Sequence, residues 1–193
     1  LKLATGIINL PYHNPVDLAE RVSTLDQMSN GRFIMGLGLS YREKELEAFG
    51  TNRKERVGRF EESLTLMKRL WMGEEVTFEG EFWKIYEGKL GLLPVQKPYP
   101  PVWIAAQSEG AVRRAAAMGD ACLLGPQPSW ADFSVLARQY RSALENQGKA
   151  GNGMLAANRS VAIARDSETA KQQAKAAGEA KVSQYVGFNM QES

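Results

Sequence analysis

The sequence predicts an α/β protein built around a parallel β-sheet. Short apolar runs bounded by Gly, Pro, Ser or Asn alternate with longer segments whose apolar residues recur at helical spacing. This alternation is typical of parallel strands joined by right-handed helical crossovers. The clearest junction lies in residues 29–50, where an apolar run ends in glycines and a charged helical segment follows at once.

The strands are expected where apolar runs are too short to form helices. Each run should be buried on both faces, as in a sheet that is covered by helices. The runs lie at residues 2–9, 33–38, 102–106, 121–125 and 159–164.

The helices are marked by caps and by apolar spacing. Pro15 suits the first position of a helix with Asn14 as its cap, and Gly31 stops that helix. A second helix starts near residue 55, because apolar residues then recur at helical spacing as far as Trp71 and would face the sheet. Further helices are expected at residues 111–118, 130–144 and 169–184.

Residues 75–100 interrupt the alternation. The segment VTFEGEFWKIYEG alternates around a central glycine, which predicts a hairpin, and LLPVQKPYPP is a proline-rich return to the next strand. Such an insertion could simply cover one end of the fold, shape the substrate site or form an oligomer contact.

The composition is that of an ordinary globular chain. Of 193 residues, 44% are hydrophobic and 24% are charged. A net charge of +2 gives no electrostatic case for nucleic acid, and the basic residues at 53, 54, 56 and 59 are interleaved with acids, as on a solvated helix face. No apolar run approaches the roughly 18 residues of a membrane span, and no signal peptide is visible. We therefore expect a cytoplasmic enzyme without nucleic-acid or membrane partners.

The single cysteine and the single histidine narrow the chemistry further. Cys122 alone excludes an intrachain disulfide and any multi-cysteine metal site, and it reads as a small core residue. His13 alone excludes a two-histidine zinc site, so no metal centre is predicted.

Two loops carry candidate binding residues. Gly36 and Gly38 either let the backbone approach a flat ring or a phosphate closely, or serve as packing and turn devices. Ser108 either caps the helix that follows or, with the free N–H groups at that helix start, binds an anion such as a cofactor phosphate.

Four separated blocks stand out along the chain: LPYHNPVDLAE, LDQMSNGRF, the Glu45–Gly50 stretch ELEAFG, and PPVWIA before the second loop. In this order they resemble the bacterial luciferase-like flavin monooxygenase family, and the resemblance covers the chain from about Leu3 to about Arg165. The resemblance implies a (β/α)8 TIM barrel, which usually needs about 250 residues or more. The chain begins inside an apolar run and stops in an uncapped helical segment. We therefore expect an internal fragment, one domain over residues 1–193, with about five βα units.

The resemblance also implies roles for particular residues. Gly6, Ile7 and Asn9 match the segment beneath the isoalloxazine ring, where relatives have a cis peptide, here between Gly6 and Ile7. Relatives have a cationic residue where this chain has Leu39, so Arg42 or a residue outside the fragment would neutralise the phosphate. The residues expected to bind cofactor are Gly6, Ile7, Asn9, Gly38, Arg42, Gln107, Ser108, Glu109 and Gly110.

The catalytic candidates are His13 and Tyr41. His13 lies one place earlier than the histidine of many relatives, where this chain has Asn14. Its imidazole either moves a proton during the reaction or is a locally bonded turn residue. Tyr41 lies in the loop above the strands and could contact cofactor or substrate.

The function implied by the resemblance is oxygenation of a small organic substrate by reduced FMN and O2. A separate reductase would supply the reduced flavin, and a homodimer is expected by resemblance alone. An F420-dependent hydride transferase of the same superfamily is the first alternative, and a non-catalytic flavin-binding barrel is the second. A Rossmann dehydrogenase is disfavoured, because GLGLSY lacks the third glycine of its fingerprint.

Overall fold

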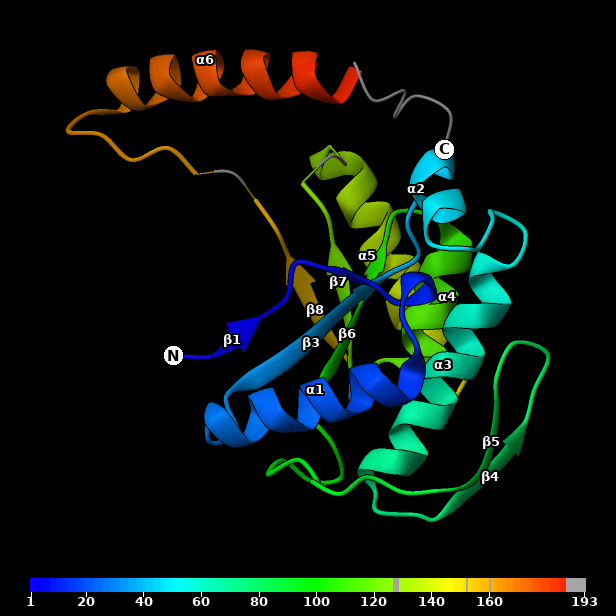
Figure 1. Ribbon diagram of the computed structural model, residues 1–193. Coiled ribbons are helices and arrows are strands. Elements are labelled where there is room, and N and C mark those ends of the chain that lie inside the picture. Colours follow the sequence, from blue (N-terminus) through cyan, green and yellow to red (C-terminus); the bar gives the residue numbers. More distant parts are fainter. Residues whose placement is uncertain (127–128, 152, 160, 187–193) are drawn as a thin grey trace. The chain divides into compact units, whose positions relative to one another are not determined.

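A computed structural model describes residues 1–126, 129–151, 153–159 and 161–186 (Figure 1). The chain forms two compact units, Leu1–Ala157 and Asn158–Ser193. The first holds the sheet and all but one of the described helices, and the second holds α6 (Ser167–Val186). The single domain expected over residues 1–193 stays a prediction.

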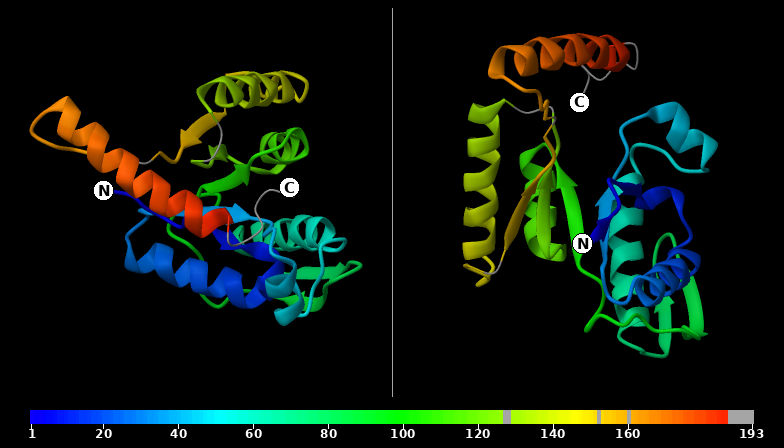
Figure 2. Two further views of the ribbon diagram at one scale, coloured as in Figure 1. Left: turned by 90° about the horizontal axis from the view of Figure 1, so that it is seen from above. Right: turned by 90° about the vertical axis from the view of Figure 1, so that its left-hand side faces the viewer.

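The first unit is an α/β half-barrel whose curled sheet is parallel throughout, as predicted. The strand order is β1-β3-β6-β7-β8, and β2 also pairs with β3. Helices cover one face of this sheet (Figure 2). The strands are β1 (Leu3–Ala4), β2 (Ile8–Asn9), β3 (Phe33–Gly38), β6 (Val102–Ala106), β7 (Ala121–Leu124) and β8 (Met154–Ala157).

The helices begin close to the predicted positions. Asn14 caps α1 through its side chain, which accepts the N–H groups of Val16 and Asp17. Trp71, at the end of α3, is fully buried, and its Nε1 donates to the carbonyl of Ala19 at 3.0 Å, which ties α3 to α1. The helices are η1 (Leu10–Tyr12), α1 (Pro15–Met28), α2 (Glu43–Ala48), α3 (Arg56–Trp71), α4 (Glu109–Met118) and α5 (Trp130–Glu145).

Three expectations about strands are corrected. The apolar run 2–9 forms two short strands, β1 and β2, which are separated by residues 5–7. The last strand is Met154–Ala157, whereas residues 159 and 161–164 of the expected run are not in a strand and residue 160 lies outside the described part. Burial on both faces holds for all of β3 but not for β1 or β8.

The misplaced strand has a packing reason. Met154 pairs with Ala121 of β7, and a Cβ on Gly153 would lie 2.2 Å from Leu144 of α5, so a glycine is needed where α5 closes on the start of β8. Val161 and Ile163, by contrast, are 78% and 87% exposed, so their alternating apolar pattern does not mark a buried strand.

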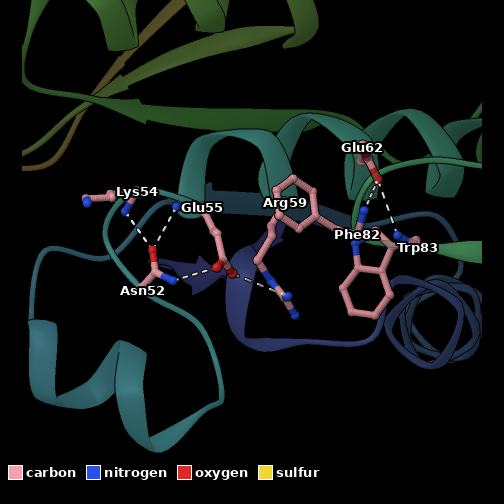
Figure 3. Close-up of polar contacts among 7 residues, drawn as sticks. All are labelled: Asn52, Lys54, Glu55, Arg59, Glu62, Phe82 and Trp83. Atoms are coloured by element: carbon pink, nitrogen blue, oxygen red, sulfur yellow. Dashed lines mark hydrogen bonds and ion pairs between the residues drawn. The ribbon is translucent and has the colours of Figure 1, made fainter.

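The predicted hairpin in residues 75–100 is formed by β4 (Val76–Glu79) and β5 (Lys84–Gly88). Its tip is fixed to α3, because the Glu62 carboxylate accepts the backbone N–H groups of Glu81, Phe82 and Trp83 at 2.7, 3.0 and 3.3 Å. Figure 3 shows the contacts with Phe82 and Trp83. The guanidinium carbon of Arg59 lies 4.9 Å from the Trp83 ring centroid. The hairpin therefore covers α3, and its use in an oligomer contact stays a prediction.

Glu62→Ala is expected to lower the free energy of unfolding by about 2 kcal/mol, because three backbone N–H groups lose a charged acceptor. Urea denaturation measures the change. The matched control is Glu61→Ala, since Glu61 forms one surface ion pair with Arg114 at 3.0 Å and should contribute less than about 1 kcal/mol. Equal losses for the two variants would contradict the role given to Glu62.

Candidate functional site

The loops after β2, β3 and β6 start at one edge of the sheet. Asn9 of β2 pairs in parallel register with Gly38, and Leu37 pairs with Ile104 of β6. Two residues further along each strand, Leu39 lies level with Ala106. Carboxyl ends of parallel strands are where α/β proteins assemble binding and catalytic groups.

Four predicted cofactor residues are brought together at this edge. The Gly6–Ile7 peptide is cis, as expected from the resemblance. A Cβ on Gly38 would lie 1.8 Å from Cδ1 of Ile7 and 3.4 Å from Oδ1 of Asn9. A Cβ on Gly6 would meet nothing within 4 Å. The backbone at Gly6 therefore faces open space, while Gly38 makes room for Ile7.

Gly36 packs closely against Thr5. Its N–H donates to the Thr5 hydroxyl oxygen at 2.8 Å, and its carbonyl accepts from the same hydroxyl at 2.9 Å. A Cβ on Gly36 would lie only 2.0 Å from the Thr5 carbonyl oxygen. Of the two interpretations of the GLG sequence, close packing accounts for both glycines, and cofactor contact by Gly38 stays a prediction.

The loop after β3 is folded around Ser40, which has a φ of +62°. Tyr41 is 37% exposed, and the guanidinium carbon of Arg42 lies 5.6 Å from the centroid of its ring. Arg42 also forms an ion pair with Glu45 at 2.5 Å, and this hydrogen bond raises the Arg42 pKa. Its charge is therefore already balanced by a carboxylate of α2.

The charge pattern of the sequence predicts that Arg56 lies on a solvated face. In the structure, Arg56 is better placed than Arg42 to bind an anion. Its Nη1 donates to the carbonyl of Ser40 at 2.6 Å, so the first turn of α3 holds the loop after β3. Burial and the neighbouring cations of Arg53 and Arg114 lower its pKa. Within the described residues, no carboxylate lies within ion-pair distance of Arg56. A partly buried cation that lacks a counter-ion can accept an anionic ligand.

The starts of α3 and α4 lie at the same level. Arg114 of α4 pairs with Glu61 of α3 at 3.0 Å, and Lys68 donates to the carbonyl of Met118 at 2.6 Å, so the helices run in the same direction. Arg56 precedes Glu61 by five residues, as Glu109 precedes Arg114. The positive ends of two helix dipoles therefore lie on the same side of the sheet as Arg56.

The loop at 107–110 opens α4. Ser108 caps the helix by accepting the Ala111 N–H at 3.5 Å, which is one of the two interpretations offered by the sequence. The preceding N–H groups of Glu109 and Gly110 have no helical carbonyl to pair with. All four residues from Gln107 to Gly110 are exposed. The Glu109 carboxylate pairs with Arg113 at 2.8 Å, so the group of Glu109 that could donate to an anion is its backbone N–H. Phosphate binding here stays a prediction.

His13 is the C-cap of η1, and its backbone N–H donates to the Leu10 carbonyl at 3.1 Å. The side chain is partly buried. Burial and the nearby Arg21 lower its pKa, and Asp17 opposes that change. The imidazole is therefore largely neutral at pH 7 and able to accept a proton.

His13 should titrate below pH 6.5, because burial disfavours the imidazolium in the folded protein. A folded-state pKa below the unfolded value means that stability is full above pH 6.5 and falls as the pH drops through the folded pKa. As the sole histidine, His13 gives one pair of imidazole proton resonances in an NMR pH titration. A midpoint at or above 6.5 would contradict this placement.

Tyr12 is a residue that the sequence analysis missed. Its hydroxyl is in hydrogen-bond contact with the Ser40 hydroxyl, and it lies 3.3 Å from a carboxylate oxygen of Glu45. Its ring stacks on Phe49 with 4.5 Å between centroids. Burial raises the Tyr12 pKa, so the phenol keeps its proton at neutral pH. The only sequence signal was an aromatic residue beside His13 in the LPYH turn.

The described residues contain neither a helix long and apolar enough to cross a membrane nor a cluster of three metal-ligating side chains. Cys122 is buried in β7, and burial raises its thiol pKa to about 12, so it is not a nucleophile.

Comparisons with known proteins agree with this architecture. Residues 1–191 match a family profile that is described as "Luciferase-like monooxygenase". The 4-hydroxyprotoasukamycin monooxygenase of Streptomyces nodosus is 30% identical over 167 residues, which are 84% of this chain and 45% of that protein. The chain spans about half or less of the length of such curated relatives.

Solved structures show the same fold. Monooxygenase RslO1 from Streptomyces bottropensis has a TM-score of 0.87 and 26% identity, over 97% of this chain and 58% of its own. The oxygenating constituent of 3,6-diketocamphane monooxygenase from Pseudomonas putida, solved in complex with FMN, has a TM-score of 0.77 and 21% identity. That match covers 90% of this chain and 52% of the solved one. The coenzyme F420 dependent tetrahydromethanopterin reductase from Methanopyrus kandleri has a TM-score of 0.76 and 20% identity, and the match covers 88% of this chain and 53% of the reductase.

Proposed function

Because the chain belongs to the luciferase-like monooxygenase family, we propose that it uses reduced FMN and O2 to oxygenate a small organic substrate. A separate reductase would supply the reduced flavin, and the protein would act as a homodimer in the cytoplasm. The family match by itself supports the more general statement that the chain is part of an enzyme, and structural neighbours of this chain use FMN or F420.

The observation that carries the proposal is the convergence of positive charge at the carboxyl edge of the sheet. Arg56, lacking a carboxylate partner in the described part of the chain, contacts the loop after β3. The first turn of α4, one strand away, presents the amides of Glu109 and Gly110. A helix start near a guanidinium that has no carboxylate partner among the described residues suits a phosphate. We assign the cofactor phosphate to this position.

The remaining groups fit the rest of a flavin. Gly6, Ile7 and Asn9 would lie beneath the ring, since the backbone at Gly6 faces open space and Ile7 is 38% exposed. Tyr41 and Arg42 would border the ring from the next loop. When bound, reduced FMN would supply the electrons that activate O2. The protein would orient the substrate and keep water from the reacting centre.

His13 is the proposed proton acceptor. Its lowered pKa keeps the imidazole in the neutral form at the pH where such an acceptor would work. The Tyr41 phenol would donate a hydrogen bond to the substrate or the cofactor from the exposed side of the loop. Among the described residues, the His13 and Tyr41 side chains do not contact each other, so each is proposed to act separately.

The alternative is F420-dependent hydride transfer. It is favoured by the structural likeness to the Methanopyrus kandleri reductase, which shows a shared fold. The same phosphate position would serve F420, because that cofactor also carries an anionic phosphate. The two functions differ in their use of oxygen.

The test follows the oxidation of reduced FMN by O2 in the presence of the full-length protein, by stopped-flow absorbance after anaerobic mixing. A monooxygenase is expected to slow reoxidation markedly relative to free flavin, because the bound flavin is shielded from solvent. Reoxidation at the free-solution rate, with F420 bound instead, would replace the proposal by the hydride-transfer alternative. Binding of either cofactor without turnover of any substrate would indicate a non-catalytic barrel.

A further inference from the structure

The segment after β3 buries few of its side chains. Residues 39–50 include α2, in which Leu46 is the only buried side chain. Ser40 and Gly50, near its two ends, have φ values of +62° and +69°. Tyr41 and Phe49 are 37% and 56% exposed. A segment with so little buried surface depends on individual polar contacts for its position.

Tyr12 supplies several of these contacts from a different loop. Its hydroxyl meets the Ser40 hydroxyl at the start of the segment and the Glu45 carboxylate inside α2. Its ring stacks almost parallel on Phe49, at an interplanar angle of 9°, at the end of α2. One side chain thus contacts the beginning, the middle and the end of the segment.

Ser40 and Glu45, which Tyr12 contacts, also bind the two arginines that are proposed to bind cofactor. The other oxygen of the Glu45 carboxylate pairs with Arg42, and the Ser40 carbonyl accepts from Arg56. The Ser40 hydroxyl also accepts the Arg42 backbone N–H at 3.3 Å. Moving Tyr12 would therefore release the partners of both arginines at once.

We infer that Tyr12 is a positioning residue that latches residues 39–50 in place and thereby fixes Arg42 and Arg56 for cofactor binding. The latch itself depends only on the contacts of Tyr12. Its consequence for the cofactor rests on the proposed function. The phenol hydroxyl carries the polar half of the latch, and the stacked ring carries the apolar half.

The test compares Tyr12→Phe with the wild-type protein. Phenylalanine keeps the stack on Phe49 and removes both hydroxyl contacts. The matched control is Tyr86→Phe, since Tyr86 also donates to a carboxylate, Glu79, at 2.6 Å, but in the hairpin. Two quantities are measured for each protein: amide hydrogen exchange in residues 40–50 without cofactor, and the dissociation constant for the cofactor that the wild type binds.

When one hydrogen bond is lost and bonds to water replace it, the equilibrium between the closed and open forms of a segment shifts by roughly fivefold. Tyr12→Phe is expected to speed exchange in residues 40–50 by about that factor and to weaken cofactor binding by a similar factor, while Tyr86→Phe changes neither. Ser40→Ala should have the same effect, and the double variant should add little to either, as contacting residues do in a double-mutant cycle.

Unchanged exchange in Tyr12→Phe would overturn the latch. Faster exchange with unchanged cofactor affinity would overturn its link to Arg42 and Arg56. If the wild type bound neither FMN nor F420, the proposed function and this link would both fall, while the exchange data would still decide whether Tyr12 holds the segment.

Discussion

Arg56→Gln is expected to weaken binding of reduced FMN by about 10- to 100-fold. The guanidinium contacts the Ser40 carbonyl, and within the described residues it has no carboxylate partner, so its charge is available to a phosphate. A charge-assisted hydrogen bond contributes about 1.5 to 3 kcal/mol, and each 1.4 kcal/mol is tenfold in affinity. Anaerobic titration of the protein into reduced FMN, followed by fluorescence or absorbance, measures the change.

Riboflavin separates the charge effect from general damage. It has the ring system of FMN without the phosphate, so Arg56→Gln should leave its affinity nearly unchanged. The control for net charge is Arg21→Gln, because Arg21 is an exposed residue of α1 paired with Asp17. Equal weakening of FMN and riboflavin would contradict the assignment of Arg56 to the phosphate. So would an unchanged affinity for FMN.

Gly36→Ala is expected to destabilise the protein by about 3 kcal/mol, at the upper end of the range for overpacked positions. The new Cβ would lie 2.0 Å from the Thr5 carbonyl oxygen, which belongs to the backbone and cannot rotate away. Relief requires β1 to move from β3, at the cost of the paired hydrogen bonds between Thr5 and Gly36. Urea denaturation monitored by circular dichroism gives the free energy of unfolding.

Gly91→Ala is the matched control, because a Cβ at Gly91 would meet nothing within 4 Å. It should be neutral or slightly stabilising, through the smaller entropy of the unfolded chain. A stable Gly36→Ala variant with an unchanged denaturation midpoint would show that the approach of β1 to β3 is not as close as described.

The sequence predicts best the features that depend on neighbouring residues. The cap and start of α1 were readable because Asn14 and Pro15 are adjacent and act within one turn. The same holds for Ser108 at the start of α4 and for the hairpin around Gly80. The parallel sheet followed from alternation alone, and the barrel fold followed from the family resemblance.

Features that depend on distant partners were not predictable in this way. Arg56 lies in a run of charges that reads as a solvated face, and its role depends on the Ser40 carbonyl 16 residues earlier. Tyr12 acquires its contacts from residues 28 to 37 positions later in the chain. The last strand was misplaced because residues 159–164 alternate more clearly than Met154–Ala157, whereas pairing with β7 selects the latter.

The most direct test of the account is a crystal structure of the full-length protein grown with FMN and, in parallel, with F420. We predict that the phosphate of the bound cofactor lies within hydrogen-bond distance of the Arg56 guanidinium and of the Glu109 and Gly110 amides at the start of α4. A cofactor bound with its phosphate away from both would contradict the central claim, as would crystals in which neither cofactor occupies the carboxyl edge of the sheet.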